Sequence, residues 1–496
     1  MTVALPAETI ASAKLQLQSA AAAVASRYPS QVEPLAAPPP GSGLKPVMGN
    51  YGFPVLGHIL DTIVDPLDFA RRRYDRYGPV SWAGGIGFRV VQLMGPEALE
   101  TVWINKDKAF SSTRGWAPVI GPFFHRGIML LDFEEHRDHR RIMAQAFTRS
   151  ALEGYLDLMR PGIARTVRGW PATRRFPLYD GVKKLLLDQA AEVFVGARLG
   201  AESDRLSEDF HHTVYGGQAV IRADVPGGAW ARGLRARERL ERYFAVQIPA
   251  RRAGAGTDLF SMLCRSRSED GDRFADEDIV NHMIFLLMAA HDTSAIAISM
   301  LAYELGRHRD WQQALRDEAN TEPGDELGLD DIDRNYPLLD CAFKETLRMY
   351  APAGTLFRQA IKDTEVAGHY IPRKAQVAIN VYASMRLADW WPEPDRFNPD
   401  RFTAGADFGA VSRYAFAPFG GGVHKCLGQQ FADMNVKAVM HQLLRNFEWT
   451  VPKGYHPRMG WGTGPTPADG LPVSMRRLGV SGGGGGSRGG GGGGRW

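Results

Sequence analysis

Cysteine is scarce in this sequence, because only Cys264, Cys341 and Cys426 occur among 496 residues. An odd and sparse set does not build a disulfide framework, and it favours a reducing, intracellular setting. It also leaves too few ligands for an iron–sulfur cluster held by four cysteines or for a zinc ribbon. Any cysteine chemistry therefore depends on a single thiol.

An excess of charge of one sign is also missing. The 59 Lys and Arg residues and the 55 Asp and Glu residues leave a net charge of +4. So even a balance argues against a nucleic-acid-binding protein and against a general binder of polyanions.

No secretory signal is visible in the first residues, which are mixed polar and small. The most apolar run, residues 283–305, is long enough to cross a bilayer, yet polar residues 291–294 lie at its middle. Burying that polar cluster in lipid would be costly, so the run predicts a long core helix. We expect a soluble, cytoplasmic protein, with peripheral contact to a membrane as an alternative.

Three segments differ in composition. Residues 1–45 are predicted to be an N-terminal extension with a proline-rich hinge, residues 46–478 one domain, and residues 479–496 a disordered glycine-rich tail. Helices outnumber strands, which predicts a mainly α protein with small β-sheets (α+β). The expected helices are 141–159, 182–195, 234–251, 278–307, 311–319, 338–350 and 429–447, and the expected strands 80–83, 88–93, 377–381 and 471–475.

The most specific motif is a glycine-rich turn that leads into a single cysteine, FGGGVHKCLG at residues 419–428. A predicted helix follows, so Cys426 would lie near a helix N-terminus, where the macrodipole and free N–H groups favour a thiolate. The glycines let the backbone approach a flat ring closely. From these residues alone, a buried structural cysteine beside a glycine-rich loop is the alternative.

This turn resembles the haem-binding signature of the cytochrome P-450 family, with Phe419, Gly422, Cys426 and Gly428 in place. The resemblance implies the cytochrome P-450 fold, with haem b sandwiched between a long distal helix and the cysteine loop. It also implies that Cys426 ligates the iron and that His424 contacts a haem propionate. The resemblance runs from about residue 46 to 475, is nearest to bacterial members without a membrane anchor, and weakly suggests the sterol-demethylase-like branch.

Further family landmarks follow in order. Glu345 and Arg348 share one helix face, and Arg401 in the Pro-Asp-Arg-Phe element completes the structural triad that the resemblance implies. His136, Arg140 and Arg358 match positions at which the family contacts the haem propionates. Without the cysteine loop, a solvated basic helix face would explain His136 and Arg140 equally well.

The polar cluster of the long helix reads Ala289-Ala290-His291-Asp292-Thr293-Ser294. By resemblance, Asp292 relays protons and the Thr293 hydroxyl holds a water or the bound oxygen, which is general-acid work. The structural alternative makes Asp292 a salt-bridge partner and lets Thr293 bond back to the carbonyl four residues earlier. His291 is expected to face another layer of the protein.

The resulting hypothesis is a monooxygenase that inserts one atom of O2 into a hydrophobic small molecule of the sterol, terpenoid or fatty-acyl type. No nucleotide-binding or iron–sulfur motif occurs, so a ferredoxin or flavodoxin with its reductase is the implied electron donor. A haem-thiolate peroxygenase or isomerase and a non-catalytic haem or ligand carrier remain as alternatives. The substrate walls are expected at 116–124, 210–228, 353–356 and 463–467.

Overall fold

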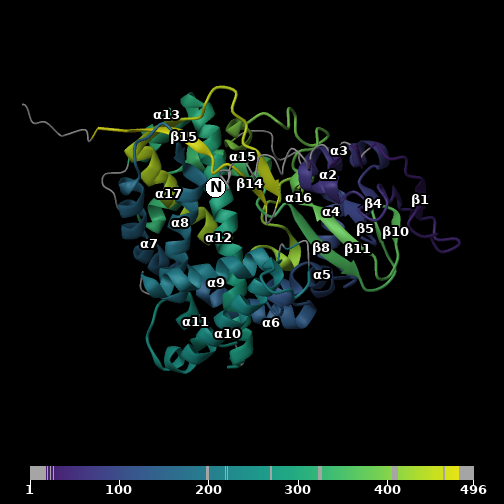
Figure 1. Ribbon diagram of the computed structural model, residues 1–496, viewed down its shortest axis with the longest axis horizontal. Helices are drawn as coiled ribbons and strands as arrows, with labels where there is room; N and C mark the ends of the chain where they lie inside the picture. The colour runs from purple at the N-terminus through teal and green to yellow at the C-terminus, as the bar shows by residue number, and fades with distance from the viewer. Residues whose placement is uncertain are drawn as a thin grey trace, which may run out of the picture.

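The computed structural model describes residues 18, 21–22, 24–25, 27–196, 200–217, 219, 222–268, 271–321, 327–404, 412–461 and 464–479. Residues 1–17 of the predicted extension and residues 480–496 of the predicted glycine-rich tail lie outside the described residues. Figure 1 shows most helices gathered on one side of the molecule and the main sheet on the other. The expected mainly α architecture with small sheets is confirmed.

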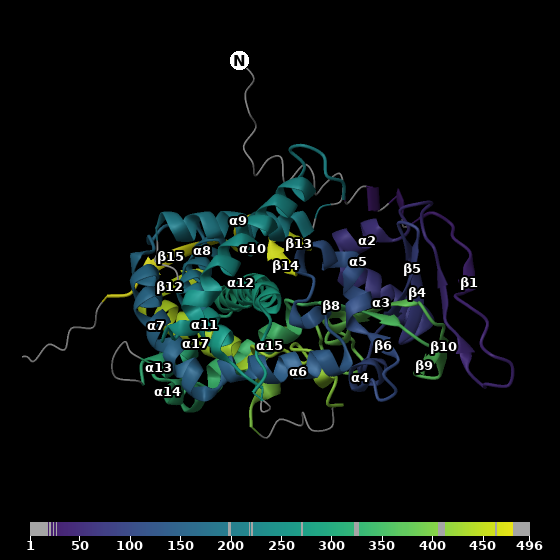
Figure 2. The ribbon, with the colours of Figure 1, turned by 90° about the horizontal axis from the view of Figure 1, so that it is seen from below.

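Helix α12 (Asp276–Arg307) runs through the centre of the helical part, and Figure 2 looks along its axis. It packs against α8 (Leu178–Ala190), α10 (Ala229–Ala253), α15 (Pro337–Met349) and α17 (Gln429–Asn446). A helix surrounded by other helices has no solvent face, which explains why its sequence is apolar all round. It is the one described helix with the length and hydropathy of a membrane span, and 78% of its most apolar window is buried inside the protein.

The remaining described helices are shorter or lie further out. They are α2 (Ile59–Val64), α3 (Pro66–Tyr77), α4 (Pro96–Ile104), α5 (Ser112–Phe124), α6 (Phe133–Ala144), α7 (Arg149–Gly169), α9 (Ala201–Gly217), α11 (Leu259–Arg265), α13 (Arg309–Ala319), α14 (Leu329–Arg334) and α16 (Val381–Ser384). A π-helix, Ala191–Val195, continues α8.

The prediction of one helix over residues 141–159 was wrong. Helix α6 ends at Ala144, a 3-10 turn occupies Gln145–Phe147, and α7 begins at Arg149. Buried Ile142 and Met143 lie before the break, buried Ala146 lies within it and buried Leu152 lies after it. The spacing of apolar residues therefore continues through the bend, so periodicity alone does not reveal that the helix is interrupted.

The main sheet has seven strands in the order β1-β3-β4-β5-β11-β8-β6, with parallel pairs β3–β4 and β5–β11. Strand β1 pairs antiparallel with β3, so the predicted domain boundary at residue 45 falls inside this sheet. A three-residue strand ending in proline has no sequence signal of its own, because its pairing comes from the tertiary fold. The described strands are β1 (Val32–Pro34), β2 (Lys45–Pro46), β3 (Met48–Asn50), β4 (Val80–Gly85), β5 (Phe88–Leu93), β6 (Phe110–Ser111), β7 (Phe176–Pro177), β8 (Thr355–Ala360), β9 (Thr364–Val366), β10 (His369–Ile371), β11 (Gln376–Asn380), β12 (Phe447–Thr450), β13 (Met459–Trp461), β14 (Pro465–Pro467) and β15 (Pro472–Arg477).

A buried histidine pair joins α6 to α12. His139 Nδ1 lies 2.9 Å from His282 Nε2, and His139 also approaches Asp278, which pairs with Arg126. His282 is fully buried, and this burial lowers its pKa to about 3. His282 is therefore neutral in the folded protein at neutral pH.

This pair predicts a loss of stability in acid. Below pH 6.5 the unfolded chain binds a proton at residue 282 that the folded protein takes up only near pH 3, so stability falls as the pH drops through this window. Between pH 7 and pH 5 we expect His282 to account for about 2 kcal/mol of the lost unfolding free energy. Urea unfolding of the protein should show a flatter pH dependence in His282→Gln, and equal slopes in both proteins would contradict this assignment.

Candidate active site

The cysteine loop is held in a shape that its glycines permit. The Cys426 N–H donates to the Phe419 carbonyl at 2.9 Å, which closes the turn. Gly420 and Gly422 have φ values of 70° and 62°, a region that side chains disfavour. A Cβ on Gly422 would lie 1.9 Å from the carbonyl oxygen of Trp103, so no other residue fits there.

Cys426 lies three residues before the first residue of α17, as the sequence predicted. Cys426 as a whole residue is exposed. The protein atoms around its sulfur nevertheless limit hydration and raise the pKa of the thiol, while the Gly428 N–H, Arg140 and Lys425 act in the opposite direction. The backbone N–H and the nearby cations favour a thiolate, as expected. In the protein alone, the lost hydration of the sulfur has the larger effect on the thiol pKa. A metal cation bound to the sulfur reverses this balance, because coordination removes the thiol proton.

Four of the predicted propionate contacts come together beside this loop. The rings of His136 and His424 lie 3.8 Å apart between centroids, although the two residues belong to α6 and to the cysteine loop. Burial, with the charges of Arg140 and Arg358, lowers the pKa of His136 to about 4 and that of His424 well below its usual value. Burial also lowers the pKa of the Arg358 guanidinium to about 10.

The basic groups of this cluster are not matched by an equal number of carboxylates among the described residues. Asp132 is the acidic group that influences His136 and Arg358, and its carboxylate already accepts hydrogen bonds from Ser111 and Ser112. His136 Nδ1 is buried and has no hydrogen-bond partner in the described part of the chain. Buried cations with an unused ring nitrogen fit a ligand that brings carboxylates of its own.

The middle of α12 exposes a short stretch within an otherwise buried helix. Met288, Ala289 and Thr293 are partly exposed, whereas Asp292 and Ser294 are buried. The Thr293 hydroxyl donates to the Ala289 carbonyl at 2.6 Å, which orients the side chain along the helix. This hydrogen bond to the carbonyl four residues earlier is the one that a purely structural role of Thr293 requires. In a catalytic role, a water shares the hydroxyl proton or replaces the carbonyl as its acceptor.

Asp292 lies in a charge cluster between α12 and α8. Its Oδ1 is 3.0 Å from His291 Nδ1 and 3.5 Å from Lys183 Nζ. His291 Nε2 lies 3.4 Å from the Lys183 carbonyl, and its ring meets Phe210 of α9 edge to face at 5.7 Å. His291 thus faces α8 and α9, in agreement with the expectation that it points to another layer.

The predicted triad forms one buried ion-pair cluster. Arg348 makes two hydrogen bonds to Glu345, at 2.7 and 2.8 Å, and both side chains are fully buried. Arg401 Nε lies 3.4 Å from Glu345 Oε1, and the Asn398 N–H donates to the same oxygen at 3.0 Å. The guanidinium of Arg348 also lies over the Trp391 ring. The triad joins α15 to the segment that precedes the cysteine loop.

An aromatic wall lies near Arg358. Trp116 of α5 meets Phe357 of β8 edge to face at 5.1 Å, and both belong to or border the predicted substrate walls. A Cβ on Gly115 would lie 2.3 Å from Arg358 Cα, so α5 touches the strand backbone. Of the other predicted wall residues, 218, 220, 221 and 463 lie outside the described residues.

Sequence reasoning missed three residues that shape this site. Lys183 pairs with Asp292 across 109 positions of sequence, Asp132 balances part of the basic cluster, and Trp103 closes over the glycines of the loop. The only available signal was a lysine within a predicted amphipathic helix, which is also typical of an exposed face. Contacts this distant in sequence leave no local pattern.

Comparison with known proteins agrees with this geometry. The family description "Cytochrome P-450" matches residues 47–460. A putative cytochrome P-450 136 of Mycobacterium tuberculosis is 43% identical over 448 residues, which cover 89% of this chain and 91% of that protein. The bovine lanosterol 14-alpha demethylase is 25% identical over 438 residues, covering 86% of this chain and 87% of that protein.

Solved structures agree as well. A cyanobacterial cytochrome P-450 with retinoic acid bound superposes with a TM-score of 0.78 at 26% identity, covering 86% of this chain and 98% of that chain. The match at family level spans the cysteine loop, the middle of α12 and the triad alike. This chain therefore belongs to the cytochrome P-450 family and is a haem-thiolate monooxygenase.

Proposed function

We propose that this enzyme binds haem b with Cys426 as the iron ligand and inserts one atom of O2 into a sizeable hydrophobic molecule. The thiolate-ligated haem, when bound, supplies the activation of dioxygen. The observation that carries the proposal is the buried basic cluster beside the cysteine loop, which lacks matching carboxylates among the described residues. His136, Arg140, Arg358 and His424 would hold the two haem propionates.

Asp292 and Thr293, in the middle of α12, would hold and deliver the protons that the reaction consumes. Asp292 is held by Lys183 and His291 on one side and adjoins Thr293, so it can pass a proton along α12. The Thr293 hydroxyl lies on the partly exposed stretch of the helix, where it can hold a water.

The substrate class follows from the chemistry of the walls. Trp116 and Phe357 offer an aromatic surface beside Arg358, which belongs to the basic cluster. Relatives named a lanosterol demethylase and a taxane hydroxylase, and a neighbour with retinoic acid bound, also point to sterol, terpenoid or fatty-acyl molecules. A screen for ligands that displace the water on the iron would select among them.

Electrons would come from a separate ferredoxin or flavodoxin with its reductase. This proposal rests on the amino-acid sequence, in which no nucleotide-binding or iron–sulfur motif occurs. We expect a soluble cytoplasmic enzyme, because the one described helix with the length and hydropathy of a membrane span is largely buried inside the protein.

Thr293→Ala tests the proposed chemistry. The substitution removes the hydroxyl that would hold the proton-delivering water, so NADH consumption should continue while its electrons appear largely as hydrogen peroxide. We expect the ratio of product formed to NADH consumed to fall by about tenfold or more. A positioned proton donor usually contributes about 100-fold or more to the rate, so a tenfold loss is a conservative expectation. Haem content and substrate binding should stay near those of the wild type.

Two further variants separate the roles at this site. Thr293→Ser keeps the hydroxyl and should keep most of the product ratio. Asp292→Asn should slow turnover by limiting proton delivery, with less effect on the product ratio. If neither Thr293→Ala nor Asp292→Asn changes rate or ratio, the peroxygenase or isomerase alternative becomes the better reading.

A further inference from the structure

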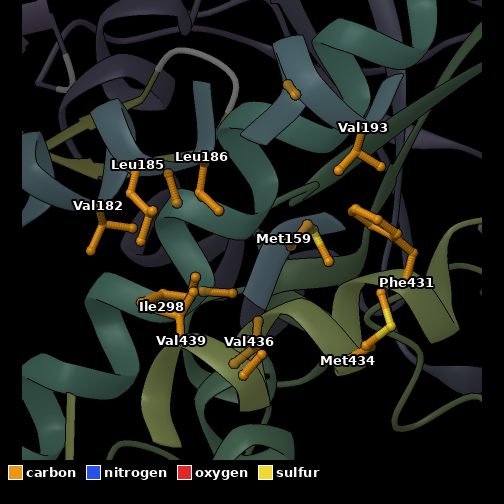
Figure 3. Packing of buried hydrophobic residues seen from close by; sticks show 14 of the residues in the cluster. Met159, Val182, Leu185, Leu186, Val193, Ile298, Phe431, Met434, Val436 and Val439 are labelled. Atoms are coloured by element: carbon orange, nitrogen blue, oxygen red, sulfur yellow. The ribbon is translucent and has the colours of Figure 1, made fainter. Parts of the chain in front are cut away.

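A small cavity lies behind the middle of α12, where α8, the π-helix and α17 meet. Figure 3 shows the apolar packing of this region, in which Leu186 of α8 and Phe431 of α17 are labelled. The surroundings of the cavity are mostly apolar, and Phe194 stacks near Phe431 at 5.2 Å. The lining residues are Leu186, Gln189, Ala190, Phe194, Ala290, His291, Phe431 and Asn435.

Two amide side chains in this wall have unused hydrogen-bonding atoms. Gln189 and Asn435 are 4% and 3% exposed. Both amide atoms of Gln189 and the Oδ1 of Asn435 have no hydrogen-bond partner in the described part of the chain. Buried amide atoms are rarely left unpaired in native proteins, because their loss of hydration is not repaid. The pair therefore points to a ligand that supplies hydrogen bonds.

The size of the cavity selects that ligand. Its volume is about 10 Å³, and about 10–15 Å³ by this measure holds one water molecule. A water both donates and accepts, so a single molecule can join an amide atom of Gln189 to Asn435 Oδ1. No organic ligand is small enough for this space.

The local backbone brings these groups together. The α-helical hydrogen bonding of α8 ends at Ala190, and the π-helix Ala191–Val195 follows. Wider π turns inside helices frequently occur at functional positions. This change of winding places Gln189 and Phe194, five residues apart, on the same wall.

We propose that Gln189 and Asn435 bind one buried water that supports α12 at Ala290 and His291. These two residues come directly before Asp292 and Thr293, so the water fixes the turn that carries the proposed proton-handling pair. Gln189 and Asn435 are positioning residues, since they act through α12. The functional half of this inference rests on the proposed function of Asp292 and Thr293.

The water site itself is tested without activity. A crystal structure of the haem-loaded enzyme should show one ordered water within hydrogen-bond distance of both amides, and the Gln189→Met structure should lack it. Thermal unfolding of Gln189→Met and of Asn435→Leu should each begin about 2 °C or more below the wild type, because each leaves the other amide and the water underbonded. The double variant should lose less than the sum of the two.

Leu185→Met is the matched control, because it changes a buried apolar side chain of α8 outside the cavity lining without removing a polar atom. A direct Gln189–Asn435 hydrogen bond with no water would overturn the site. A higher unfolding temperature in Gln189→Met would also overturn it, since removing an unsatisfied amide stabilises a dry cavity.

The functional half has its own readout. Gln189→Met should lower the ratio of product to NADH by about twofold or more while the haem spectrum stays unchanged, and Leu185→Met should leave the ratio alone. A water present in the crystal with an unchanged ratio would refute support of the proton-handling turn. If the wild type forms no product with any donor, the proposed function fails and this half fails with it, whereas the crystal and unfolding results still decide the water site.

Discussion

Cys426→Ala should abolish the far-red-shifted carbon monoxide Soret band of the reduced, haem-loaded protein. The band reports a thiolate opposite carbon monoxide, and Cys426 is the only cysteine in the glycine-rich loop beside the basic cluster. Monooxygenase activity should fall to the background rate, because the sulfur that donates electron density to the iron is gone. Reduced carbon monoxide difference spectra and haem content, measured together, give the result.

The other two cysteines serve as controls. Cys264 is buried, and burial raises its pKa to about 11, while Cys341 is also buried with a raised pKa. Both thiols stay protonated, and neither lies in the loop. Cys264→Ala and Cys341→Ala should therefore keep the band. Retention of the band in Cys426→Ala with loss in either control would refute the ligand assignment.

Arg348→Ala should destabilise the folded protein by about 3–5 kcal/mol, because it leaves the fully buried Glu345 carboxylate with only the 3.4 Å contact to Arg401 and the Asn398 N–H. Glu345→Ala should have an effect of similar size, since it removes the carboxylate that pairs with the buried guanidinium of Arg348. Arg348 also donates to the carbonyls of Met385 and Pro394, so Arg348→Ala further loosens the chain before the cysteine loop. Urea unfolding and haem retention at equal protein concentration measure both effects.

Two further variants grade this cluster. Arg401→Ala should cost less than Arg348→Ala, because Arg401 meets Glu345 through a single 3.4 Å contact and is not fully buried. Arg396→Ala is a matched arginine control, since its ion pair with Glu393 is about two-thirds exposed on both sides and should be worth at most about 1 kcal/mol. Normal stability in both Glu345→Ala and Arg348→Ala would remove the triad as a structural support.

Local sequence predicted the long elements well. The apolar pattern of 278–307 became α12 at Asp276–Arg307, and the strand 88–93 became β5 at Phe88–Leu93. Both carry a periodic signal that depends only on neighbouring residues. The helix at 141–159 failed, because the bend at Gln145–Phe147 depends on distant partners. The pairing of β1 with β3 was not predicted for the same reason.

The cysteine loop was readable for a physical reason. Gly420, Gly422 and Cys426 must lie at fixed spacing, since a positive φ and a close approach to Trp103 exclude other residues at the glycines. When a site is confined to one short loop, the residues that it requires lie next to one another in the sequence. For this reason the sequence by itself determined the family, the ligand candidate and the mainly α class.

Only the tertiary structure decided which side chains meet. The contact of His136 with His424, the pairing of Asp292 with Lys183 and the approach of Gln189 to Asn435 each join residues more than 100 positions apart. Their energies come from burial and from charges brought together by the packing of α6, α8, α12 and α17, and local pattern carries no information on such packing. The protein atoms around the Cys426 sulfur limit its hydration and raise the pKa of the thiol, against the direction that its place before α17 had suggested.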